Sequence, residues 1–204
     1  MARPNHLDLK SLERTAWRSY HGEGLFDILL GLILIAIGVG HALDSTLAAV
    51  VLELLALVAF IAGKRLITVP RMGLVKFGSE RRARRMRTKA VFAVVALLGL
   101  AAYLLMARGG SAAQWLADHS TLTGWLFSIV AFGAFGAMAY WLDLPRLFWA
   151  ATMYALAIAL AELTGSPVVF LVTGALVLAP GLVLLARFLR QYPLPTGGEY
   201  HGRP

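Results

Sequence analysis

The feature that most constrains this chain is a set of six long apolar runs. Each run has 17 to 22 residues, and they cover residues 25–43, 46–63, 90–107, 124–142, 147–163 and 168–189. At a rise of ~1.5 Å per residue, a helix of this length matches the ~30 Å hydrocarbon layer of a bilayer. Helices of a soluble bundle carry polar residues at helical spacing, which these runs lack. The sequence therefore predicts an all-α, polytopic membrane protein with a bundle of six transmembrane helices.

Composition supports this class and excludes several others. Hydrophobic residues make up 59% of the 204 positions and charged residues only 15%, too few charges for an ordinary soluble domain. The chain has no cysteine, so disulfides, thiolate nucleophiles and cysteine metal sites are excluded. It also lacks phosphate-binding, dinucleotide-binding, zinc-protease and serine-nucleophile motifs. We therefore expect no enzyme activity, no catalytic residue, no metal site and no cofactor.

The positive charges predict the orientation. The chain has 19 Lys and Arg residues, and all except Arg108 fall on one side of the six predicted spans. Because positively charged loops stay on the cytoplasmic side, both termini are predicted to be cytoplasmic, in a plasma or inner membrane. None of the five tryptophans lies in the middle of a span, which is typical of side chains at the two membrane interfaces.

The runs divide the chain into five parts. We expect an amphipathic interfacial helix in the cytoplasmic segment 1–24, a transmembrane hairpin over 25–63 and a basic cytoplasmic loop over 64–89. Four further spans follow over 90–189, and 190–204 is predicted to be a flexible cytoplasmic tail. Within the loop, the pattern of residues 66–77, which includes Pro70 and Gly73, predicts no regular secondary structure.

The end of the basic loop is a cluster of positive charges directly before the third run. We define the basic segment by these residues: Arg81, Arg82, Arg84, Arg85, Arg87 and Lys89. Charges joined to a span lie within a Debye length of the headgroups, so anionic lipid is the nearer ligand and nucleic acid is not expected. The segment either binds anionic lipid or a partner protein, or only fixes the orientation of the chain during insertion.

One acid lies in the middle of a predicted span. A carboxylate at this depth costs ~2.5 to 3.5 kcal/mol, so Glu53 is expected to face the bundle, find a partner or stay protonated. The connection at 44–45 is so short that the first two spans must pair antiparallel, and residues whose numbers sum to about 89 then share a depth. This places Glu53 beside Ala36. The residue is either a group that handles a proton or cation, a structural hydrogen-bonding group, or a lipid-facing or subunit contact.

A second acid, Asp27, lies at the start of the first span. The same relation places it about one turn from Lys64 and Arg65 at the end of the second span. We therefore predict an interfacial ion pair of Asp27 with these bases, which would fix the first hairpin. With His21 and Glu23, Asp27 also makes a weak candidate cation site.

Small residues and one proline predict how the helices pack. Gly31 and Gly38 are seven residues apart, a spacing that places both on one face of the first span and favours close helix contact. Pro180 removes one backbone hydrogen bond from the sixth span and Gly181 follows it, so a kink is predicted there.

Two functions fit these features. The first is a small permease or channel, expected to be a homo-oligomer, for a proton, cation or small solute, in which Glu53 faces a polar path. The alternative is a non-catalytic accessory or scaffold protein that binds anionic lipid or a membrane-protein partner through the basic segment.

Overall fold

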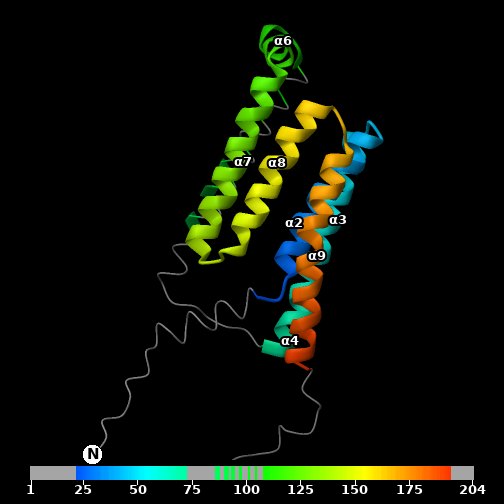
Figure 1. Cartoon of the computed structure of the whole chain (residues 1–204). Helices are drawn as coiled ribbons and strands as arrows, with labels where there is room; N and C mark the ends of the chain where they lie inside the picture. The colour runs from blue at the N-terminus through cyan, green and yellow to red at the C-terminus, as the bar shows by residue number, and fades with distance from the viewer. Residues whose placement is uncertain are drawn as a thin grey trace, which may run out of the picture.

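The chain folds into helices that run beside one another (Figure 1). The computed structural model describes residues 22–72 and 109–193, with single positions between 86 and 108. Among these residues the regular elements are all helical. They are α2 (Leu25–Ala42), α3 (Thr46–Gly63), the π-helix η1 (Lys64–Thr68), α4 (Val69–Met72), α6 (Ser111–Asp118), α7 (Ser120–Leu142), α8 (Arg146–Thr164) and α9 (Val168–Gln191).

Five of these helical stretches are long and apolar enough to cross a membrane: α2, α7, α8, α9 and the continuous stretch Thr46–Met72. This confirms an all-helical fold that is compatible with a membrane protein. The third predicted span falls in the part from which only single positions are described. The predicted interfacial helix and most of the C-terminal tail lie outside the described residues.

The hairpin of α2 and α3 has the depth relation that the sequence predicts. Asp44 adopts a left-handed conformation with φ 47°, which closes the turn. Ser45 then caps α3, because its hydroxyl oxygen accepts a hydrogen bond of 3.2 Å from the backbone N–H of Ala48. Farther along, Gly40 lies directly against Ala49, and these two numbers sum to 89. The two helices are therefore antiparallel neighbours.

The second span differs from the prediction at its end. The sequence suggested a loop from residue 64, but the helix continues through η1 and α4 to Met72. The turn widens in η1, where the N–H of Val69 donates to the carbonyl of Lys64. Pro70 follows η1 inside this continuous stretch, and, because proline has no backbone N–H, one helix hydrogen bond is absent there. Charged residues end the apolar run here without ending the helix.

The closest helix contact joins α2 to α9 through glycines. A Cβ atom at Gly31 would lie 2.7 Å from the backbone nitrogen of Leu178, and one at Gly174 would lie 2.9 Å from the carbonyl oxygen of Gly31. Gly38 lies against Phe170 in the same way. Glycine at these positions lets the two backbones approach, as small residues do in membrane helix pairs. The predicted role of Gly31 and Gly38 in helix contact is confirmed, and the contact lies within one chain.

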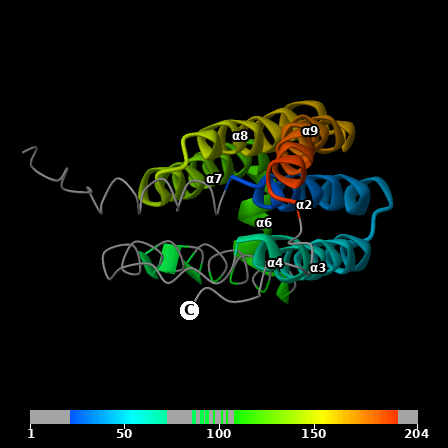
Figure 2. The same ribbon diagram turned by 90° about the horizontal axis from the view of Figure 1, so that it is seen from below.

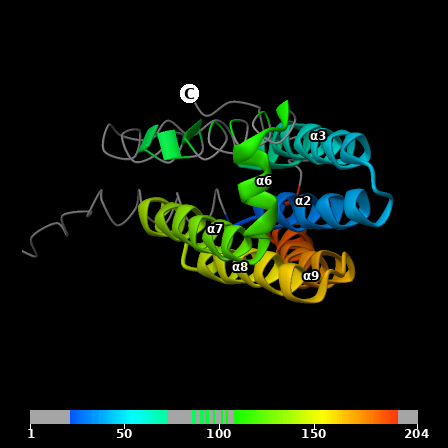
Figure 3. The same ribbon diagram turned by 90° about the horizontal axis from the view of Figure 1, so that it is seen from above.

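The buried core lies between α2, α7, α8 and α9 (Figures 1 and 2). Its fully buried centre includes Leu34 of α2 with Leu147 and Ala157 of α8. Among the described residues α3 adds none to this cluster, and it lies on the far side of α2 from α9 (Figure 3). The four helices α2, α7, α8 and α9 therefore enclose the core, and α3 packs on the outside of α2.

Candidate functional site

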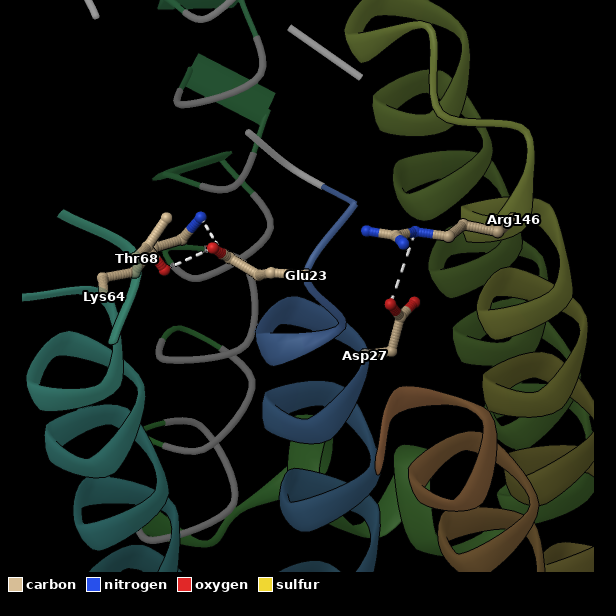
Figure 4. A network of polar contacts seen from close by, with 5 residues as sticks. All are labelled: Glu23, Asp27, Lys64, Thr68 and Arg146. Atoms are coloured by element: carbon tan, nitrogen blue, oxygen red, sulfur yellow. Dashed lines mark hydrogen bonds and ion pairs between the residues drawn. The ribbon is translucent and has the colours of Figure 1, made fainter. Parts of the chain in front are cut away.

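Five polar side chains gather where α2 begins (Figure 4). They come from four parts of the chain: the residue before the cap of α2, the first turn of α2, η1 and the first residue of α8. We call this group the polar cluster; its members are Glu23, Asp27, Lys64, Thr68 and Arg146.

Glu23 is the most buried charge of the polar cluster. Its side chain forms an ion pair with Lys64 and accepts a hydrogen bond from the hydroxyl of Thr68, both on η1. Glu23 is 1% exposed and Thr68 0%. Gly24 follows with φ 82°, and a Cβ atom there would overlap the carbonyl oxygen of Gly181. The chain therefore enters α2 pressed between η1 and α9, which holds the Glu23 carboxylate in place.

Asp27 forms the second ion pair of the polar cluster. Its Oδ2 lies 3.3 Å from Nε of Arg146, the first residue of α8. The side chain of Asp27 is 9% exposed and that of Arg146 is 25% exposed. Asp27 also lies in the first turn of α2, where the helix dipole favours a negative charge.

The ion pairs of the polar cluster join α2 to its neighbouring elements. Two carboxylates and two bases balance in charge, and each acid reaches a different neighbouring element. A buried charge without a partner costs several kcal/mol, so removing one member of such a pair destabilises the fold. The cluster thus ties α2 to η1 on one side and to α8 on the other.

The sequence placed Asp27 and Lys64 at this site but paired them wrongly. Lys64 pairs with Glu23, and Asp27 pairs with Arg146 across the α2–α8 contact, while Arg65 is exposed. The helix turns Lys64 and Thr68, four residues apart, toward the segment that precedes α2, and Asp27 points from α2 toward α8. Sequence reasoning missed Thr68 and Arg146. The available signal for Arg146 was its position at the start of a span on the same predicted side as Asp27.

Glu53 lies midway along α3 and is half-buried. Its neighbours Leu52 and Leu54 are exposed, so the surface around it is apolar. In the part of the chain that the structure describes, no hydrogen bond or ion pair involves the Glu53 carboxylate. Glu53 is therefore not a member of the polar cluster, and its place inside a membrane span stays a prediction.

Tyr154 of α8 is a polar side chain of the core. It is buried, and its hydroxyl donates a hydrogen bond of 2.8 Å to the carbonyl oxygen of Leu30 on α2. This hydrogen bond joins α8 to α2.

The remaining predicted site residues are Pro180 and Gly181 in the last helix and the six bases of the basic segment. α9 continues across Pro180 without a break, and Gly181 is buried with its Cα facing Ile28 and Asp27 of α2. The kink at Pro180 stays a prediction, whereas Gly181 gains a packing role. In the basic segment, Arg87 is described as an exposed helical residue, and Arg81, Arg82, Arg84, Arg85 and Lys89 lie outside the described residues.

The described residues contain no group of three or more His, Asp or Glu side chains that could hold a metal ion. Comparison with known proteins adds no assignment: no family model, no curated protein and no solved structure matches this chain.

Proposed function

We propose that this protein is a small integral membrane protein that passes a proton or a small cation across the bilayer, with Glu53 as the group that carries it. The single observation behind this proposal is a half-buried carboxylate midway along a membrane-length helix, without a polar partner among the described residues. Ionisable groups inside a bilayer are costly and commonly mark the paths of ions and protons.

The contrast with the other buried polar groups supports this choice. Ser128 on α7 donates to the carbonyl of Ala155, and Tyr154 donates to the carbonyl of Leu30. Glu23 and Asp27 have basic partners in the polar cluster. Each of these groups has a partner within the fold, which favours a structural role. Glu53 has no such structural role among the described residues, which favours a functional one.

A flux assay on purified protein in liposomes tests the proposal. With a potassium gradient, valinomycin and a pH-sensitive dye inside the vesicles, we expect proton uptake by the wild type and a loss of roughly 100-fold in E53Q, because an amide cannot release a proton. E53D should keep part of the flux. The matched control is E162Q, which changes an exposed acid at the far end of α8.

A second assay, which measures the flux of sodium or potassium instead of protons and omits valinomycin, distinguishes a cation cargo from a proton cargo. Flux of a cation that needs Glu53, without proton uptake, would identify the cation as the cargo. Flux that is the same in E53Q and the wild type for protons and for both cations would contradict the proposal.

The alternative is an accessory protein that holds anionic lipid through the basic segment. The observation that favours it is the concentration of positive charge directly before the third predicted run. At about 1 kcal/mol per basic residue near an anionic surface, the segment could contribute several kcal/mol of lipid association. Phosphatidylglycerol should then raise the Tm of the detergent-solubilised protein more than phosphatidylcholine does. Replacing all six bases with Gln should abolish that difference; an unchanged difference would contradict the alternative.

A further inference from the structure

The short helix α6 runs in a different direction from the long helices α2, α7 and α8. In Figure 1 it is seen along its axis at one end of the bundle, while α7 and α8 lie lengthwise, and Figure 3 shows it crossing the direction of α7 and α2. It therefore lies across the bundle axis at the end opposite to Lys64 and Arg146. If the long helices cross a bilayer, a helix in this position lies parallel to the membrane surface.

Two breaks in the backbone set this direction. Before α6, Gly109 and Gly110 have φ values of 68° and 93°, which only glycine adopts readily. After α6, His119 leaves the helical conformation with φ −114° and ψ 36°, and its carbonyl accepts the first hydrogen bond of α7 from Thr123. The chain is therefore built to turn into α6 and then out of it.

The corner between α6 and α7 is held by an aromatic contact. The rings of Trp115 and His119 stack with centroids 4.6 Å apart and planes 19° apart. The His119 Nδ1 also donates to the carbonyl oxygen of Trp115 at 2.9 Å. This contact fixes the indole ring at the level where α7 begins.

The exposed face of α6 has the chemistry of a membrane interface. Ser111, Gln114 and Asp118 are exposed at helical spacing, and Trp115, on the same face, is 50% exposed. Tryptophan is enriched at the headgroup level because its ring is apolar and its N–H is polar. Small polar side chains beside it suit hydrated headgroups.

We propose that α6 is an in-plane helix that lies in the lipid headgroup layer, with Trp115 as its anchor. Lipid headgroups are the occupant because α6 directly precedes the membrane-length helix α7 and lies across its end. This inference depends on membrane insertion and is independent of the role of Glu53.

Site-directed spin labelling tests the proposal, and the chain suits it because it contains no cysteine. Three single-cysteine variants, S111C, Q114C and D118C, place labels on the exposed face of α6. L122C, L126C and I129C provide the matched set on exposed positions of α7. Depth is measured in liposomes from the accessibility of each label to oxygen and to a water-soluble nickel complex.

If α6 lies in the plane of the membrane, all three α6 labels should have the same depth. That depth should be within about 5 Å, the length of one helical turn, of the headgroup level. The α7 labels should descend by ~10 Å from residue 122 to residue 129, at 1.5 Å per residue. A descent of the same size along α6 would show an upright helix and overturn the proposal. Full accessibility of the α6 labels to the nickel complex, with no oxygen enhancement from lipid, would place α6 in water and would also overturn it.

Discussion

The helices α2 and α3 are joined by a short turn and are similarly apolar, yet their surroundings are opposite. Half of the membrane-length window of α2 is buried inside the protein, against 6% of the window that includes α3. Leu34 on α2 is fully buried, whereas Leu54 on α3 is 56% exposed. Hydropathy therefore identifies both helices as apolar enough to cross a membrane, but it does not say which one belongs to the core.

The glycines of the two helices explain the difference. α2 contains Gly31, Gly38 and Gly40, and two of these bring it against α9. The one glycine of α3 is Gly63, at its last position. In a membrane the surrounding lipid is as apolar as leucine, so helices associate where their backbones can approach closely. The central position of α2 follows from its glycines, whereas the small residues inside α3 are alanines, which do not let a neighbouring backbone approach as closely.

Truncating one leucine on each helix should give the largest contrast. We expect L34A to lower the free energy of unfolding by about 3 kcal/mol, because it leaves a cavity in a closely packed core. L54A should lower it by less than ~1 kcal/mol, since lipid can fill the space. Unfolding in mixed micelles with increasing SDS measures both. Equal losses in the two variants would contradict the difference between α2 and α3.

Adding one methyl group to the α2–α9 contact should have the next largest effect. G31A places a Cβ 2.7 Å from the backbone nitrogen of Leu178, an overlap that should cost about 2 kcal/mol as the helices separate. In the control G133A, on α7, the new Cβ meets nothing within 4 Å. The same SDS titration should find the control at least as stable as the wild type, because alanine favours helix. A stable G31A would show that the close contact is absent.

The polar cluster gives a smaller and more specific test. In a double-mutant cycle, E23Q and K64M should show a coupling of about 1.5 kcal/mol, because each removes the same buried ion pair. The sequence alone predicts an ion pair of Asp27 with Lys64 and Arg65. The Arg65 part of this prediction should behave differently: D27N and R65Q should be additive within ~0.5 kcal/mol. Coupling in the second cycle and additivity in the first would reverse the assignment of partners.

Much of the fold was predictable from the sequence because length and apolar composition are local properties. The runs 25–43 and 168–189 agree closely with α2 and α9, and the short connection at 44–45 fixed the hairpin. The extension of the second helix to Met72 is not predictable from the apolar run, because Lys64 and Arg65 end that run before the helix ends. Charge limits the hydrocarbon-matched part of a helix, whereas the backbone hydrogen bonds can continue into water.

The candidate site was less predictable because it depends on which helices become neighbours. Glu53 stood out in the sequence, since a carboxylate in a span is unusual wherever the helix packs. The partner of Asp27 did not, because the contact of α2 with α8 brings together residues more than one hundred positions apart. A pattern along one helix cannot supply that contact, although it can name the residues that need a partner.

The difference in burial predicts that, in a bilayer, α2 lies inside the protein and α3 faces lipid. Photolabelling of the wild-type protein in liposomes with a lipid-dissolved carbene reagent measures this directly, with adducts located by peptide mass spectrometry. We predict dense labelling of the exposed leucines and valines of α3 and sparse labelling of α2. Equal labelling of α2 and α3, or no labelling of either, would contradict the account.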